Sequence, residues 1–176
     1  MNLESIQSID LNQNIKIENG LIEENTKQNK KVFGIYDPAE NDFDLNMWSA
    51  TKAENIKASL KRIEKIKLSK TATEIFERIL LSFSYPPQGI NDEEFADLKI
   101  NWLIKNKRTN LIESFLKQNE NFKSKSVAVQ YLVDENIAEA DITNGCKKIK
   151  FIDKKIKDAY LEKFKIYCLV FNDKKP

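Results

Sequence analysis

Residues 91–105 read NDEEFADLKINWLIK, a helix-start signal followed by apolar residues at helical spacing. Asn91 can act as an N-cap, and Glu94 can complete a capping box. The same succession of start signal, apolar run, polar break and second apolar run returns near Ser124 and near Lys157, at intervals of 33 residues (124 − 91 and 157 − 124). Such spacing is typical of stacked helical hairpins. We therefore expect an all-α fold, a short α-solenoid of antiparallel hairpins similar to tetratricopeptide repeats.

Two helices are expected before residue 91, which brings the total to about seven. The first should begin at Thr51, with Glu54 completing a capping box. The second should begin at Thr71 with Glu74, bury Ile75 among other apolar residues, and stop at the Pro-Pro pair that follows.

The last two helices are expected at about 138–150, after a break at Asn136, and at about 155–171. The final helix should turn one apolar set inward: Tyr160, Leu161, Phe164, Tyr167, Cys168 and Phe171. Residues 167–171 lack the polar composition of a solenoid cap. We therefore expect the natural protein to continue past Pro176.

The N-terminal part differs from the rest in composition. Residues 1–46 are rich in Asn and Asp and lack a helical apolar period, so we expect an extended N-terminal arm before a helical-repeat domain at 47–176. Alternating apolar residues around Asn19-Gly20, within 15–22, predict a hairpin in this arm. Residues 1 to about 30 are expected to be poorly ordered unless they bind a partner or pack along the helices.

Composition limits the function classes. The chain of 176 residues has 29 Lys and Arg against 27 Asp and Glu, a net charge of +2 that does not favour nucleic acid or an anionic membrane as partner. It has no apolar run of about 18 residues, so no membrane span is expected. The first six residues do not resemble a secretory signal. Two explanations stay open: a cytoplasmic protein, or a mature form whose leader was replaced by Met1.

Catalytic and cofactor motifs are not found. The chain has no histidine and two cysteines, which removes Ser-His-Asp catalysis, Cys-His catalysis and most zinc sites. Its four glycines are scattered, so there is no phosphate-binding loop. Two Ser-x-x-Lys matches, beginning at Ser49 and Ser114, lack the partner motifs of penicillin-recognising enzymes. We expect no enzyme activity, no cofactor and no metal.

One segment resembles the opening of a calcium-binding loop. Asp42, Asp44 and Asn46 stand at ligand spacing. Met47 replaces the glycine that makes the sharp turn, and Ala53 replaces the bidentate glutamate. An acidic loop before a helix N-terminus is the better interpretation.

The two cysteines, Cys146 and Cys168, lie on consecutive predicted helices at equal distances from residue 157, inside the predicted turn. An antiparallel hairpin would place them side by side, and a bond between them would contribute about 3 kcal/mol. Two reduced, buried thiols are the alternative, and the residues alone leave both open.

The first helix carries a possible basic interaction face formed by Lys57, Lys61, Arg62 and Lys65. Together with a second lysine cluster at 147–157 it could form a groove for RNA or for an acidic partner. Aromatic residues for base stacking fall on the apolar stripes instead. A solvated face is therefore the favoured interpretation, and nucleic acid is disfavoured.

Several short motifs carry a resemblance to a known group: FGIYD at 33–37, MWSAT at 47–51, SFSYPP at 82–87 with Gly89, and Cys146 spaced to Tyr167-Cys168. Through them the chain, from about residue 33 onward, resembles uncharacterised, exported helical-repeat proteins of alphaproteobacteria. The chain departs from the group in being rich in Lys and Asn rather than Ala and Leu. The resemblance implies a longer parent protein and an oxidised cysteine pair, and it implies no catalytic residues.

These observations favour a non-enzymatic protein-interaction or scaffold module. Two alternatives stay open: an accessory helical domain of a cell-wall-acting enzyme whose catalytic part lies outside this chain, and an RNA-binding helical repeat. The periplasm or cell envelope is slightly favoured over the cytoplasm. The partner is expected to be a protein.

Overall fold

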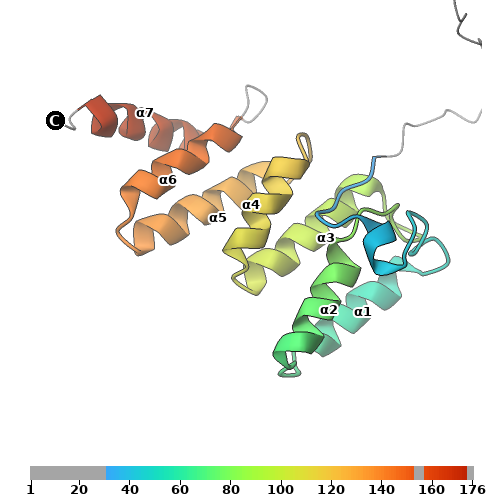
Figure 1. The fold of residues 1–176 in the computed structure, drawn as a ribbon. Helices are drawn as coiled ribbons and strands as arrows, with labels where there is room; N and C mark the ends of the chain where they lie inside the picture. The colour runs from blue at the N-terminus through green and yellow to red at the C-terminus, as the bar shows by residue number, and fades with distance from the viewer. Residues whose placement is uncertain (1–30, 153–156, 174–176) are drawn as a thin grey trace, which may run out of the picture.

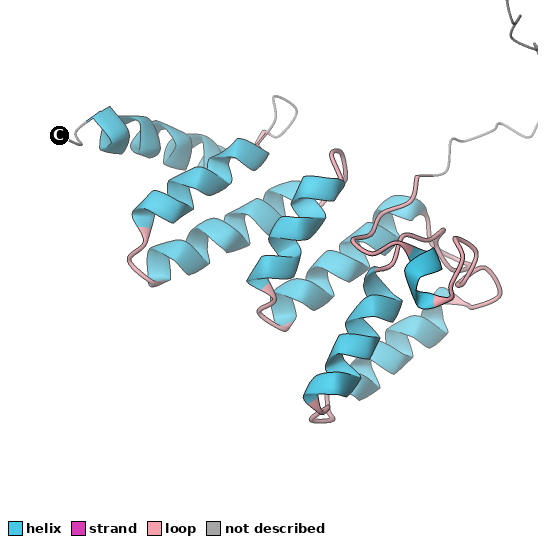
Figure 2. Ribbon diagram, viewed as in Figure 1, coloured by secondary structure: helices cyan, strands magenta, loops and turns pink. Residues whose placement is uncertain are grey.

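A computed structural model describes residues 31–152 and 157–173. Within these ranges the protein is all-α, as expected, with seven α-helices and no strand (Figures 1 and 2). The helices are α1 (Ala53–Ile63), α2 (Lys70–Leu81), α3 (Asp92–Lys105), α4 (Thr109–Gln118), α5 (Lys125–Ala138), α6 (Ile142–Lys148) and α7 (Ala159–Asp173). Two short 3-10 helices, η1 (Pro38–Asn41) and η2 (Ile149–Phe151), complete the order.

The helices from α3 onward contact neighbours that are one or two places away in chain order. Helix α3 packs on α4 and α5, and α5 packs on α6 and α7. In Figure 1 the helices follow one another from α1 and α2 on the right to α7 on the left. Successive odd-numbered helices begin at Asp92, Lys125 and Ala159, at intervals of 33 and 34 residues. The sequence interval therefore marks the starts of α3, α5 and α7.

Helix α3 begins with the expected capping box. The Asn91 Oδ1 atom accepts from the Glu94 backbone N–H at 2.9 Å, and the Glu94 carboxylate accepts from the Asn91 backbone N–H at 3.0 Å. These bonds satisfy two backbone donors that a helix start leaves without partners. The buried face of α3 then enters a core shared with α4 and α5, whose fully buried members include Ile100, Leu103, Ile112, Phe115, Val129 and Leu132.

Helix α1 does not start with the expected Thr51–Glu54 capping box, and this expectation was wrong. The N-cap is Lys52, which makes no side-chain capping bond. A backbone bridge replaces it, because the Ala53 N–H donates to the Gln88 carbonyl at 2.8 Å and the Gln88 N–H donates to the Thr51 carbonyl at 2.9 Å. The hydrogen-bond acceptor for the first N–H group of α1 thus comes from Gln88, in a loop that is distant in sequence.

The start expected for α2 was also wrong. Its N-cap is Ser69, whose Oγ accepts from the Ala72 backbone N–H at 3.2 Å, and Thr71 is exposed within the first turn. Ile75, expected inside, is 55% exposed. The buried residues of α2 are Glu77, Leu80 and Leu81.

Helix α2 ends before the proline pair that was expected to stop it. The C-cap is Ser82, in extended conformation, four residues before Pro86. Ser82 forms an isolated parallel bridge with Tyr36, and the Phe83 N–H donates to the Tyr36 carbonyl at 3.0 Å. Pairing with the N-terminal segment, rather than proline sterics, accompanies the end of the helix.

The break between α5 and α6 lies later than expected. Asn136 stays within α5, where its side-chain amide donates to the Leu132 carbonyl at 2.7 Å. The turn instead forms at Ala140, in the left-handed region with φ of 58°, followed by Asp141 as the N-cap of α6. Helix α6 is consequently short, and η2 continues it.

The N-terminal segment that the structure describes is part of the same core. Phe33 is buried, and its ring packs edge-on against Phe122 with centroids 6.2 Å apart. The hairpin predicted at residues 15–22 lies outside the described residues.

Candidate functional site

Lys99 of α3 is a lysine without any exposed surface, and it binds the backbone of two other segments. Its ammonium donates to the carbonyl of Phe33 at 2.7 Å and to the carbonyl of Ser82 at 2.9 Å. The Ser84 hydroxyl lies 3.5 Å away, and the centroid of the Phe95 ring lies 4.5 Å away. Burial lowers the pKa of Lys99 to about 7, because the charged form loses its hydration.

Asn119, at the end of α4, holds the same N-terminal segment from the other side. Its Oδ1 accepts from the Gly34 N–H at 3.1 Å, and its Nδ2 donates to the Gly34 carbonyl at 2.8 Å. A Cβ atom at Gly34 would lie 2.5 Å from the backbone N of Phe83. Residue 34 must therefore be glycine for the two backbones to approach so closely.

Lys99 and Asn119 form an anchor, not a reaction centre. A catalytic lysine must reach substrate, whereas Lys99 has no exposed surface and its hydrogen bonds go to main-chain carbonyls and a serine hydroxyl. The anchor joins the segments 33–37 and 82–87, two of the motifs that carry the resemblance noted above. Neither residue was predicted from the sequence, although a lysine between Ala96 and Leu103 on an apolar helix face is a visible signal.

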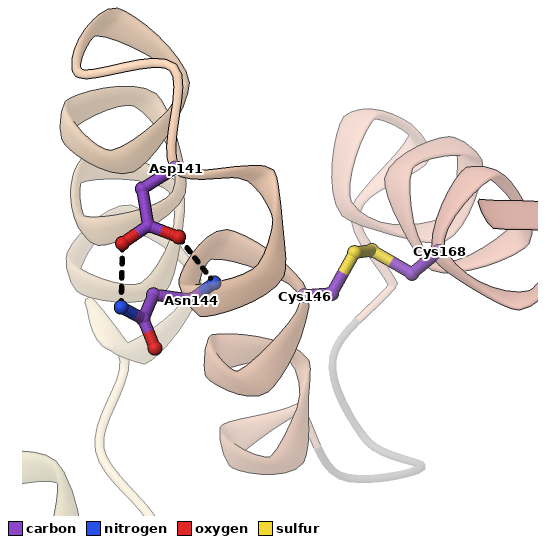
Figure 3. The surroundings of a disulfide bond; sticks show 4 residues. All are labelled: Asp141, Asn144, Cys146 and Cys168. Atoms are coloured by element: carbon purple, nitrogen blue, oxygen red, sulfur yellow. Dashed lines mark hydrogen bonds between the residues drawn. A yellow bond between two sulfur atoms is a disulfide. The ribbon is translucent and has the colours of Figure 1, made fainter. Parts of the chain in front are cut away.

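The disulfide candidate is confirmed. Cys146 of α6 and Cys168 of α7 are bonded, with Cα atoms 5.5 Å apart (Figure 3). The bond closes a loop with a sequence separation of 22, for which the chain-entropy model gives a stabilisation of about 3 kcal/mol. It ties α7 to the shortest α-helix of the described chain.

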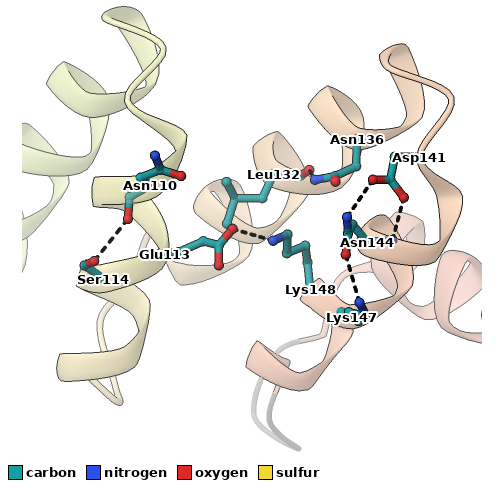
Figure 4. A network of polar contacts seen from close by, with 9 residues as sticks. All are labelled: Asn110, Glu113, Ser114, Leu132, Asn136, Asp141, Asn144, Lys147 and Lys148. Atoms are coloured by element: carbon teal, nitrogen blue, oxygen red, sulfur yellow. Dashed lines mark hydrogen bonds and ion pairs between the residues drawn. The ribbon is translucent and has the colours of Figure 1, made fainter.

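A polar network fixes α6 beside α4 and α5 (Figure 4). Asp141 caps α6 by accepting from the backbone N–H of Asn144 at 3.0 Å and from its side-chain amide at 2.6 Å. These bonds, the backbone one first, hold the pKa of Asp141 below its usual value. Lys148 forms an ion pair with Glu113 of α4. The short helix that carries Cys146 is thus held at both ends.

Helix α7 packs on α5 and α6 through Leu161, Phe164 and Cys168, which recur at helical spacing and are buried. Asp158 caps its start by accepting from the backbone N–H groups of Tyr160 and Leu161. The Tyr160 hydroxyl donates to Asp134 of α5, and burial together with this bond raises the pKa of Tyr160 to about 12. The inner side of α7 is therefore occupied by packing contacts with α5 and α6.

The opposite side of α7 is apolar and exposed, and we call it the outer face. It is formed by Ile166, Tyr167, Leu169 and Val170, which are 62%, 48%, 60% and 49% exposed. Tyr160 and Tyr167 were expected to point inward. Tyr167 is exposed instead, and Tyr160 is 38% exposed although its hydroxyl reaches Asp134 of α5. The reason is that residues 166–171 are apolar on every side, so periodicity alone could not distinguish the buried face.

The four basic residues predicted as an interaction face, Lys57, Lys61, Arg62 and Lys65, do not form a surface that is free of acidic side chains. All four are exposed on or just after α1. Lys57 and Lys61 line a groove of about 530 Å³ between α1 and α3, in which Glu94 and Asp97 also lie. Carboxylates beside these lysines would repel phosphate, so the arrangement does not favour nucleic acid.

The remaining sequence candidates have ordinary structural roles. Asp42 is the C-cap of η1 and Asp44 accepts from the Asn46 backbone N–H at 2.6 Å. The Ser114 hydroxyl donates to the Asn110 carbonyl of its own helix. In the described ranges no group of three or more acidic or cysteine side chains could hold a metal ion, and none of the described helices has the length and apolar character needed to span a bilayer.

Comparison with known proteins adds no family assignment: no family model, curated protein or solved structure matches the chain.

Proposed function

We propose that this protein is a non-enzymatic interaction module and that its contact surface is the outer face of α7. One observation carries the proposal: four large apolar side chains lie together on one helix with about half or more of their surface in water. Scattered exposed apolar residues need no explanation, but a contiguous group marks a binding surface. Covering each of these side chains would contribute roughly 1 kcal/mol or more.

The outer face is held rigidly, which suits binding. The inner side of α7 is buried against α5 and α6, and the bond between Cys146 and Cys168 restrains the helix near the middle of the outer face. A surface fixed before binding loses less conformational entropy when a partner docks. The affinity of the partner would therefore depend on this bond.

The arrangement of the helices suggests how a partner would dock. If the chain is a short solenoid, α5 covers α3 and α7 covers α5, and the next helix would lie on the outer face of α7. A partner helix with an apolar stripe would take that place. Lys163 and Lys165 are exposed on α7 beside the outer face, so the partner would carry acidic residues at the edges of its stripe.

The disulfide supports an oxidising location for this module. Structural disulfides persist in the periplasm or outside the cell and are rare in a reducing cytoplasm. We therefore propose that the interaction takes place in the periplasm or cell envelope, with a protein as the partner.

Site-specific photo-cross-linking in cells that naturally produce the protein tests this proposal. Benzoylphenylalanine replaces Leu169 on the outer face or, as a matched control, Val127, which is 49% exposed on α5. We expect a defined protein adduct from position 169 and not from position 127. Equal labelling at both positions, or no adduct at 169, would overturn the proposal.

A further inference from the structure

The groove between α1 and α3 is a second surface of the molecule, away from α7. Both helices begin beside one loop, because the Ala53 N–H donates to the Gln88 carbonyl and Asn91 caps α3. They also end together, because Lys105 of α3 forms an ion pair at 2.5 Å with Glu64, the C-cap of α1. The two helices therefore run in the same direction, and this ion pair bounds the groove at their C-terminal ends.

The two walls of the groove carry opposite charges. Lys57 and Lys61 line it from α1, and Glu94 and Asp97 line it from α3. Within the described ranges neither lysine forms an ion pair or a side-chain hydrogen bond. Each carboxylate accepts a hydrogen bond from the protein through one of its oxygens, which leaves the other oxygen available to a ligand. A ligand with charges of both signs would therefore find partners on both walls.

The groove also contains hydrogen-bond donors that suit a peptide backbone. Trp102 lines it although only 5% of its surface is exposed. The indole N–H of Trp102 and the exposed side-chain amide of Asn101 have no hydrogen-bond partner among residues 31–152 and 157–173. Polar groups with so little access to water are normally hydrogen-bonded. A main-chain carbonyl of a bound peptide would supply the missing acceptor.

The dimensions of the groove suit an extended segment. Its volume is about 530 Å³, and ligand sites commonly have about 300 to 1,000 Å³. Helix α3 rises by roughly 17 Å from Glu94 to Lys105, which is the length of about five extended residues. A helix of that length with its side chains is about 10 Å wide and would need well over 1,000 Å³. We therefore expect an extended peptide rather than a helix in this groove.

The spacing of the charges indicates the sequence pattern of such a peptide. Lys57 and Lys61 are four residues apart on α1, which separates them by about 6 Å along the helix axis. In an extended peptide, residues i and i+2 point to the same side and are about 6.7 Å apart. Acidic residues at i and i+2 would reach both lysines. A basic residue at i+1 would point to the opposite wall, toward Glu94 and Asp97.

We propose that the groove between α1 and α3 binds an extended segment of a partner protein in which acidic and basic residues alternate. This inference goes beyond the proposed function, because it concerns a different surface from the outer face of α7. Exposed ion pairs each contribute little, so a single short segment would bind with a dissociation constant on the order of 0.1 to 1 mM. Specificity would come from the order of the charges rather than from their number.

Two synthetic pentapeptides of identical composition test the inference. Acetyl-Glu-Lys-Glu-Lys-Glu-amide alternates its charges, and acetyl-Glu-Glu-Glu-Lys-Lys-amide carries them in two blocks. Each is titrated to about 2 mM into the nitrogen-15-labelled full chain, whose two tryptophans give two indole N–H signals that Trp48→Phe assigns. We expect the alternating peptide to shift the Trp102 signal and not that of Trp48, whose indole nitrogen is buried. It should also bind at least fivefold more tightly than the block peptide.

Charge reversal supplies the second arm of the test. Lys57→Glu with Lys61→Glu should weaken binding of the alternating peptide at least tenfold, because acidic side chains would then oppose one another. Lys163→Glu with Lys165→Glu on α7 is the matched control and should leave the dissociation constant unchanged. All four lysines are exposed, so both variants should keep the helical circular dichroism spectrum of the wild type. Addition of 0.5 M NaCl should weaken binding to the unmodified chain.

Three results would overturn the inference: equal affinity for the two peptides, an unchanged Trp102 signal, or equal binding by the two charge-reversal variants. The comparison of the two peptides uses the unmodified chain, so it decides the question even if a variant fails to fold. Cross-linking from position 169 reports on the outer face of α7 alone. The proposed function therefore stands or falls separately from this inference.

Discussion

The ammonium of Lys99 donates to the carbonyl of Phe33 at 2.7 Å across 66 residues of sequence. The same ammonium binds the carbonyl of Ser82, so one side chain of α3 joins the N-terminal segment to the end of α2. Buried carbonyl groups need hydrogen-bond donors, and Lys99 supplies one to each of these two, while the Ser84 hydroxyl also donates to the Ser82 carbonyl at 3.3 Å. The contact explains why a lysine occupies a position that has no exposed surface.

Changing Lys99→Met should alter the pH dependence of stability. The folded-state pKa of Lys99 is about 7 and the unfolded value is about 10.5, so the unfolded chain binds one extra proton between these values. The free energy of unfolding of the wild type should therefore rise relative to that of Lys99→Met as pH rises from 7 to 9.5, by up to about 1.4 kcal/mol per unit. Below pH 7 the difference should be constant. Urea unfolding at pH 6, 7, 8 and 9.5 measures it, and parallel curves would contradict the burial of this amine.

Changing Gly34→Ala should destabilise the fold by about 2 kcal/mol or more. The new Cβ would lie 2.5 Å from a backbone nitrogen, which can yield only if the N-terminal segment moves off Asn119. Gly145→Ala is the matched control, because it lies within α6 and its nearest neighbour would be 3.4 Å away. That change should be neutral or stabilising by up to about 1 kcal/mol. Equal losses for both variants in chemical denaturation would show that residue 34 is not closely packed.

Breaking the disulfide should weaken the attachment of α7. Cys146→Ser with Cys168→Ser should lower the free energy of unfolding by about 3 kcal/mol. In the native protein, intact mass after alkylation should show no reactive thiol until a reductant is added. Two thiols that alkylate in unfolded, unreduced protein would mean that the bond is absent from the natural molecule.

Charge substitutions on α7 should distinguish its two sides. Leu169→Asp on the outer face should change stability by less than about 0.5 kcal/mol, because the site is exposed. Leu161→Asp, about two turns earlier on the buried side, should cost more than about 3 kcal/mol. Thermal unfolding of the two variants gives the comparison, and similar losses would place Leu169 in a packed environment.

The features that could be predicted from the sequence depend on residues that lie close together in the chain. The capping box of Asn91 and Glu94 involves residues three apart, and it appeared as expected. The symmetric placement of Cys146 and Cys168 about a turn likewise depends on one hairpin, although sequence alone left two thiols as an alternative.

The features that sequence missed depend on distant partners. The start of α1 is satisfied by Gln88, so its local capping signal at Thr51 was misleading. Lys99 is buried only because the segments around Phe33 and Ser82 meet at α3. The outer face of α7 escaped prediction because the helix is apolar on every side near Val170, and only packing decides which side is covered.

The central claim is that the outer face of α7 is a docking surface for a protein. The most direct measurement is the dissociation constant of the partner identified by cross-linking at position 169, determined for the wild type, Leu169→Asp and the control Val127→Asp. The account predicts at least tenfold weaker binding for Leu169→Asp and unchanged binding for Val127→Asp. Equal affinity for the wild type and Leu169→Asp would contradict it.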